Sequence, residues 1–156
     1  MLLAIYLNDH LAGSTVGREL AKRSAANNRG SQYGTFLHGL TEEIAQDRGT
    51  LVEIMRALGV RVDRLKWLGA WGAEKLGRLK LNGSLRGYSP LSRVVELEGL
   101  ALGINGKLAL WRALEQLAPN LPELAGFDLP GLAARAEGQL QGLEAHRLRA
   151  VTEALG

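Results

Sequence analysis

The sequence predicts an all-α protein, an antiparallel bundle of four long helices with a fifth amphipathic helical segment between the two helical hairpins. Three observations support this fold class. Apolar residues recur every three to four positions, the helix formers Ala, Leu, Arg and Glu dominate, and strand-like alternation is nearly absent. With 156 residues, of which 46% are apolar and 22% charged, the chain fits a single domain with a sizeable core.

The first two expected helices form a hairpin. Apolar or small residues at helical spacing predict a helix over residues 2–27, which the run Asn27-Asn28-Arg29-Gly30 ends. Ser31 is suited to cap a second helix over residues 31–58, and Gly59 suits the carboxyl end of that helix. Because the link between the helices is short, we expect them to lie antiparallel.

The middle of the chain predicts an inserted helix and the start of the second hairpin. Leucines on one face indicate a helix over residues 61–81, and Asn82-Gly83 is a turn signal. The pair Ser89-Pro90 is typical of an N-cap followed by a first-turn proline, so a further helix is expected over residues 90–117.

The last expected helix follows a proline-rich loop. Residues 119–130 hold three of the four prolines, which predicts a loop between the two helices of the second hairpin. Asp128 is placed to cap a final helix over residues 131–155.

Several of the 20 glycines lie inside the expected helices, four residues apart: Gly13 with Gly17, and Gly99 with Gly103. Each lowers helix stability by about 1 kcal/mol relative to alanine. Close approach of two helix backbones is the interpretation we favour. Room for a ligand between the helices is the alternative.

Composition excludes several classes of site. The chain has no cysteine, so disulfides and thiolate metal sites are excluded, and a metal would need His, Asp or Glu ligands, which favours iron, manganese or zinc. No apolar run of about 18 residues and no signal-peptide pattern is present, so we expect a soluble, cytoplasmic protein. The net charge of +3 is too small to predict nucleic-acid binding.

Each long helix carries one ionisable residue on its expected apolar face. At 100° per residue, His10, Asp47, Glu98 and His146 fall within these faces, and Glu43 falls at the edge of one. At about 1.5 Å per residue, the first two lie ~12–17 Å from an end of the bundle and the last two ~12–14 Å from an end. One layer of the core is therefore expected to hold them all.

Such a layer has two interpretations. Two imidazoles and two or three carboxylates suit a divalent metal, with an open coordination position for oxygen or water. The alternative is a metal-free network of hydrogen bonds between histidine and carboxylate, which fixes the register of the helices. The sequence leaves both open, with the metal-free network as the more common arrangement.

Four runs carry a resemblance to a known family: Tyr6-Leu7-Asn8-Asp9-His10, Glu42-Glu43-x-x-x-Asp47, Glu96-x-Glu98 and Glu144-x-His146-Arg147. With them the chain resembles the ferritin-like helical bundles, in particular uncharacterised bacterial proteins of that class. The resemblance implies a carboxylate-bridged di-iron centre used for iron oxidation, hydroxylation or peroxide chemistry.

The chain departs from that family's pattern of Glu-x-x-His on two helices. Glu144 and His146 are two residues apart and point ~200° away from each other, and His38 falls opposite the apolar face of its helix. The resemblance therefore implies a reduced iron site with oxidative chemistry, a mononuclear site, or a bundle without metal.

A second hypothesis rests on the segment 61–88, where seven basic residues stand against two acidic ones. Trp67 and Trp71 fall beside basic residues on one face of the expected inserted helix. This face predicts a non-enzymatic module that self-associates as a homo-oligomer or binds a partner; a nucleic acid or a membrane surface is the less favoured partner. The residues of this face are Arg64, Trp67, Trp71, Lys75 and Arg78. Whether the protein is an enzyme stays open at this stage.

Overall fold

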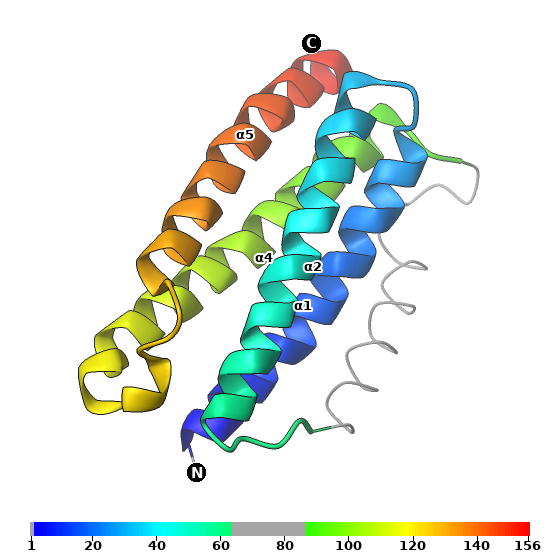
Figure 1. The fold of residues 1–156 in the computed structure, drawn as a ribbon. Helices are drawn as coiled ribbons and strands as arrows, with labels where there is room; N and C mark the ends of the chain where they lie inside the picture. The colour runs from blue at the N-terminus through cyan, green and yellow to red at the C-terminus, as the bar shows by residue number, and fades with distance from the viewer. Residues whose placement is uncertain (1, 64–86) are drawn as a thin grey trace.

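The computed structural model describes residues 2–63 and 87–156, and this part of the chain contains four long α-helices and no strand (Figure 1). The all-α prediction is confirmed for these residues. None of the described helices combines the length and the apolarity that crossing a bilayer requires. The helices are α1 (Leu2–Asn27), α2 (Gln32–Ala57), α4 (Pro90–Leu117) and α5 (Leu129–Leu155).

A tight turn joins α1 to α2. The Ser31 hydroxyl accepts a hydrogen bond from the backbone N–H of Gly34 (3.2 Å), so the predicted cap of α2 is confirmed. Gly30 has a φ of 80°, a left-handed conformation that favours glycine. A Cβ at Gly34 would overlap the backbone carbonyl of Asn28, so only glycine fits at this close approach.

A glycine ends α2, and hydrogen bonds to α1 hold the residues that follow it. Gly59 has a φ of 67° and ends the helix, as predicted. Beyond it, the Asn8 amide donates to the carbonyl of Arg61 (3.0 Å) and accepts from the N–H of Asp63 (2.6 Å). The prediction of a helix from residue 61 is wrong for residues 61–63, because these contacts hold them on α1 in an irregular conformation. The rest of the range 61–81 lies outside the described residues.

Helices α4 and α5 both begin at capped ends. Ser89 and Ser92 form a reciprocal capping box around Pro90, which confirms the predicted start of α4. The segment predicted as a loop contains two short 3-10 turns, Ala118–Asn120 and Pro122–Leu124. Asp128 then accepts from the N–H of Gly131 (3.0 Å), as predicted, and α5 begins at Leu129, two residues earlier than expected.

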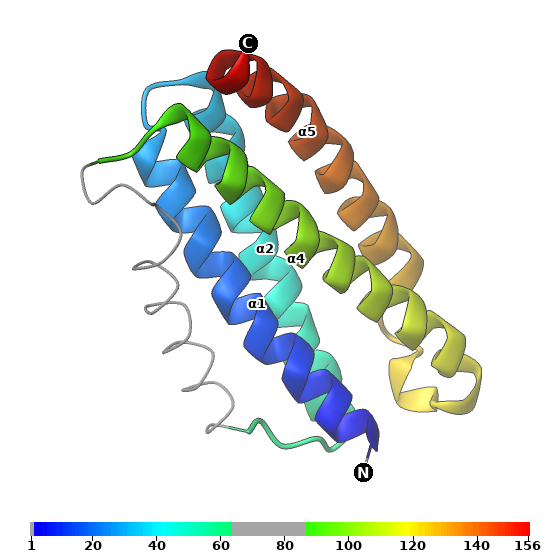
Figure 2. The ribbon, with the colours of Figure 1, turned by 180° about the vertical axis from the view of Figure 1, so that it is seen from behind.

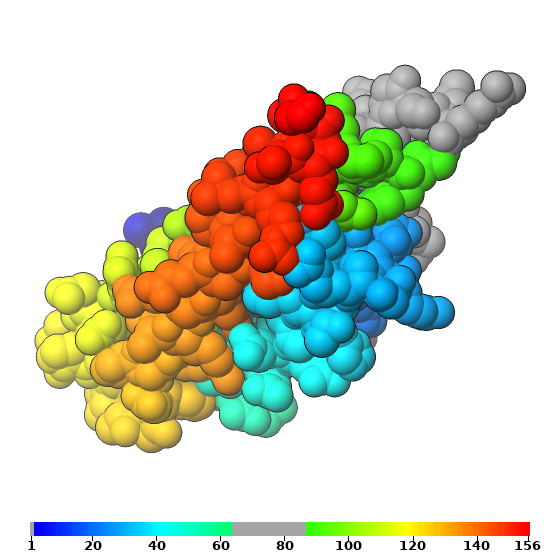
Figure 3. Space-filling view, turned by 90° about the horizontal axis from the view of Figure 1, so that it is seen from above, coloured from blue at the N-terminus to red at the C-terminus, as the bar shows by residue number. Residues whose placement is uncertain are grey.

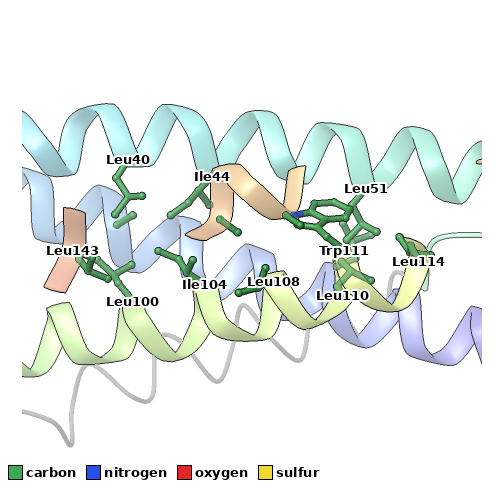
Figure 4. Packing of buried hydrophobic residues seen from close by; sticks show 14 of the residues in the cluster. Leu40, Ile44, Leu51, Leu100, Ile104, Leu108, Leu110, Trp111, Leu114 and Leu143 are labelled. Atoms are coloured by element: carbon green, nitrogen blue, oxygen red, sulfur yellow. The ribbon is translucent and has the colours of Figure 1, made fainter. Parts of the chain in front are cut away.

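The α1–α2 pair packs against the α4–α5 pair through unequal contacts. Helix α1 packs on α4 along part of its length, and Figure 2 shows these two helices side by side. The α2 and α5 backbones approach closely at few positions, although their surfaces adjoin in the space-filling view (Figure 3). Figure 4 shows Ile44 and Leu51 of α2 facing Ile104 and Trp111 of α4 in the apolar core, where each buried side chain stabilises the fold by ~1.5–3 kcal/mol.

The buried face of α4 differs from the predicted one. The prediction placed Glu98 on it, but the Glu98 side chain is 51% exposed, and Leu102, one turn further along the helix, is 76% exposed. Leucines and valines occur on every side of α4, so the apolar periodicity does not determine which side faces the core. The buried residues are Val94, Leu97, Leu100, Ile104, Leu108, Leu110, Trp111 and Leu114.

Candidate functional site

A cavity of about 310 Å³ lies between α1, α2 and α4. Its volume is at the lower end of the range for small-molecule sites in proteins. Much of its wall is apolar and comes from α2 and α4. These apolar lining residues are Ile44, Leu51, Leu100, Ile104, Leu110 and Trp111.

Four glycines form the part of the wall that belongs to α1 and α4. At Gly13, Gly17, Gly103 and Gly106, an added Cβ would meet no atom of residues 2–63 and 87–156 within 4 Å. These residues leave space open instead of allowing two backbones to touch. The favoured interpretation of close helix packing is wrong for Gly13, Gly17 and Gly103, and the alternative of room between the helices describes them.

Gly99 behaves differently, although it belongs to the same four-residue spacing. A Cβ at Gly99 would lie 3.1 Å from Cδ2 of Leu20, which is tight packing of α4 on α1. The packing interpretation therefore holds for Gly99, whereas its partner Gly103 lines the cavity.

A network of buried charges forms one side of the cavity. Asp47 is 2% exposed, and its carboxylate accepts from the Lys107 ammonium and from the Arg135 guanidinium. The Gln139 amide accepts from Lys107 and donates to Glu43 (2.8 Å). Charges removed from water must be paired to be tolerated. Two acids and two bases from α2, α4 and α5 satisfy that requirement here.

Lys107 links this network to the cavity. Burial lowers the pKa of Lys107 below its ordinary value, and the Asp47 carboxylate opposes that shift. Because its ammonium donates to Asp47 and Gln139, the wall at Lys107 is polar and locally charge-balanced.

His10 lies on the same cavity as Asp47, as the sequence predicted for this pair. Its half-buried ring meets the Tyr6 ring edge to face, with 4.5 Å between centroids. Burial lowers the pKa of His10, and the Asp9 carboxylate opposes the shift. Since the ordinary pKa is already below 7, the imidazole is neutral at pH 7.

His146 lies in a different part of the bundle. Its ring stacks on Phe36 (4.1 Å between centroids), meets Tyr33 edge to face, and donates from Nδ1 to the carbonyl of Gly142 (2.8 Å). Phe36 precedes Asp47 by three turns of α2, or about 16 Å along the axis. The imidazole of His146 is therefore far from the cavity that His10 lines.

Glu98 is also remote from the Asp47 network. Its exposed carboxylate accepts from Arg147 on α5 (3.4 Å). The prediction placed these residues in one layer because it gave each pair a similar distance from an end of the bundle. The distances of His10 and Asp47 refer to one end, and those of Glu98 and His146 refer to the opposite end. Asn28 at the α1–α2 turn donates to the Tyr88 hydroxyl (2.7 Å), so α4 starts at the end of the bundle that holds this turn. We call this end the turn end, and Glu98 lies near it.

The predicted metal ligands thus divide into groups. His10, Glu43 and Asp47 lie in or beside the cavity region, while Glu98 and His146 lie near the turn end. Among residues 2–63 and 87–156, no group of three or more His, Asp or Glu side chains is placed to hold a metal ion. Metal binding by these five residues stays a prediction.

Sequence reasoning missed the partners of Asp47, which are Lys107, Arg135 and Gln139. A signal existed for two of them. Lys107 stands between Ile104 and Trp111 at core spacing, and Gln139 occupies a similar position on α5. Arg135 gives no comparable signal, because it reaches Asp47 from the edge of the buried face.

Two further predictions concern residues away from the cavity. The predicted exposure of His38 is confirmed, since its side chain is 76% exposed and lies beside Glu42. The partner-binding face of Arg64, Trp67, Trp71, Lys75 and Arg78 lies outside the described residues.

Comparison of the chain with protein-family models, with curated proteins and with solved structures found no match. The cavity and the charge network are therefore interpreted from their own geometry and chemistry.

Proposed function

We propose that this chain is a ligand-binding protein that holds a small, mostly apolar molecule between α1, α2 and α4. The four glycines of the cavity wall carry this proposal. Each lies in the interior of a long helix, and the space that its side chain would fill belongs to the cavity. A glycine in a helix interior lowers stability by about 1 kcal/mol relative to alanine. Four such losses around one cavity, with no packing gained, are expected where the space itself is used.

The buried charge network supports the same proposal. Asp47, Lys107 and Arg135 tie α2, α4 and α5 together beside the cavity. A site whose wall is fixed before binding loses less conformational entropy when the ligand enters. The network therefore favours a preformed cavity, which a ligand can enter without a rearrangement of the helices.

The metal-binding hypothesis is the weaker alternative. Both oxygens of Asp47 already accept from cationic side chains, so a divalent metal would have to displace Lys107 and Arg135. Glu98 and His146, which were expected to complete the site, lie near the turn end. The residues do not fit a carboxylate-bridged di-iron centre, and we derive no oxidative step from them.

We propose, as the finer description of the fold, an antiparallel, ferritin-like arrangement of the helices. Contacts at the two ends support it. At one end Asn28 meets Tyr88 and Arg93 meets Glu153, and near the other end Asn8 holds Arg61.

Titration with 1-octanol by isothermal calorimetry tests the proposed function. The substitution Gly17→Leu places a side chain in the cavity and should weaken octanol binding by about tenfold or more, which corresponds to about 1.4 kcal/mol. Gly138→Leu is the matched control, because a Cβ on this glycine of α5 would also have no described atom within 4 Å, but the residue does not line the cavity. Equal affinity for both variants and the wild-type protein, or no octanol binding to the wild-type protein, would overturn the proposal.

A further inference from the structure

Two neighbouring arginines lack partners among the described residues, and one of them lines the cavity. Arg48 of α2 lines the cavity, and Arg18 of α1 lies close enough to act on its charge. Burial lowers the pKa of Arg48, and repulsion from Arg18 lowers it further. Within the part of the chain that the structure describes, neither side chain has a hydrogen bond or ion pair, and Nε of Arg18 is buried without an acceptor.

The remaining polar groups of the wall do not neutralise these two cations. The Asp47 carboxylate is shared between Lys107 and Arg135. The Ser14 hydroxyl donates to the backbone carbonyl of Leu11 (2.6 Å). The Asp9 carboxylate also lines the cavity, but it acts on the charge of His10, and Arg18 is the only charged group that shifts the pKa of Arg48 among the described residues. No anionic group of the described wall is therefore assigned to Arg48.

One more unpaired donor belongs to the cavity lining. Trp111 lines the cavity, and its indole N–H is buried with no hydrogen-bond acceptor in the described part of the chain. A buried donor left without an acceptor lowers stability by ~1–3 kcal/mol. Among the described residues, the unpaired polar groups in or beside this cavity are thus two cations and a neutral donor, all of which need an acceptor or a negative charge.

We propose that the ligand is a small amphiphilic carboxylate whose apolar body fills the cavity and whose carboxylate binds Arg48, with Arg18 as the second cation. This inference rests on the proposed function and names the chemical class of its ligand. A guanidinium presents two parallel N–H donors that match a carboxylate, and a negative charge beside both arginines removes their repulsion. The cavity volume limits the body to a short chain or a single ring.

Three probes with one chain and different head groups test the inference: octanoate, 1-octanol and octylamine, titrated by calorimetry at pH 7 and low salt. Octanoate should bind about tenfold or more tighter than 1-octanol, and octylamine most weakly. Raising the salt concentration should weaken octanoate binding and leave octanol binding nearly unchanged, because only the charged head group is screened.

The substitution Arg48→Gln separates the head group from the body. It should lower octanoate affinity by about tenfold or more and change octanol affinity much less. Arg112→Gln is the control, because Arg112 is an exposed arginine of α4 that pairs with Glu137 (2.6 Å) outside the cavity. This control should leave both affinities unchanged.

The outcomes distinguish the two proposals. Octanol binding without a gain for octanoate, or an equal loss of both probes in Arg48→Gln, would overturn the carboxylate inference and leave the proposed function standing. Octanoate binding that persists in Gly17→Leu would place the ligand elsewhere and also overturn it. Absence of binding by all three probes would overturn both.

Discussion

Glycines at the turn end of the bundle and glycines in its middle have opposite surroundings. Near the α1–α2 turn, a Cβ added to Gly99 would lie 3.1 Å from Cδ2 of Leu20. A Cβ added to Gly142 would lie 3.0 Å from Cε2 of Phe36. In the middle, the glycines of α1 and α4 face open space. The difference lies in the neighbours: large side chains fill the first region, and in the second the glycines line a common cavity. Glycine spacing alone therefore does not distinguish packing from a cavity.

The two regions also treat charge differently. At the turn end, Arg93 donates to Asn28 (2.6 Å) and Tyr88 donates to Glu96 (3.0 Å) in a partly exposed network. In the middle, the Asp47 carboxylate is almost fully buried. Solvent screens the first network and does not reach the centre of the second, so substitutions should have larger effects in the middle.

The largest expected effect comes from Asp47→Ala. This substitution leaves Lys107 and Arg135 without their shared buried carboxylate, and it should lower the free energy of unfolding by ~3–5 kcal/mol. Equilibrium unfolding in urea measures the change. Glu98→Ala is the control at an exposed ion pair, with an expected loss of about 0–1 kcal/mol. A similar loss for both variants would contradict the contrast between the two regions.

The next effect tests the filled region. Gly142→Leu forces a side chain against the Phe36 ring, which is itself stacked on His146, and should destabilise the protein by ~1–3 kcal/mol. Thermal unfolding measures it, with Gly138→Leu, one turn earlier on α5 and open, as the matched control. If Phe36→Ala is combined with Gly142→Leu, the two losses should be less than additive. Full additivity would show that the ring is not the obstacle.

A feature of these regions could be predicted from the sequence where the residues of a single helix determine it. Caps are local, so Ser31, Ser89 and Asp128 could be predicted from single residues and their neighbours. The burial of Asp47 also followed from helical periodicity, because α2 has a clear apolar face.

Features that depend on several helices at once could not be predicted in this way. Glu98 was misplaced because α4 has apolar residues on all sides, and its orientation is decided by α1 and α5. The partners of Asp47 come from α4 and α5, and no periodicity within α2 points to them. The cavity likewise exists only where glycines of α1 and α4 line the same space.

A smaller effect of opposite sign tests the open region. Gly103→Ala adds a methyl group where no other described residue lies within 4 Å, so it should raise the free energy of unfolding by about 1 kcal/mol through helix propensity. Urea unfolding measures the gain. Gly99→Ala on the same helix must displace Leu20 and should gain less. A loss of stability for Gly103→Ala would show that its surroundings are packed after all.

The smallest effect concerns pH at the turn end. Burial raises the pKa of Tyr88 from 10.0 to about 12; the Asn28 hydrogen bond lowers it, and the Glu96 charge and hydrogen bond add to the rise. A raised folded-state pKa gives stability that is fully present below pH 10 and is lost as the pH rises towards 12. Because the ring is partly solvent-exposed, we expect a loss of at most about 1 kcal/mol. Urea unfolding at pH 9 and pH 11.5 measures this loss, which should be smaller in Tyr88→Phe. An equal loss in both proteins would assign the alkaline change to other groups, and the turn end would then contribute no titrating contact to the difference between the two regions.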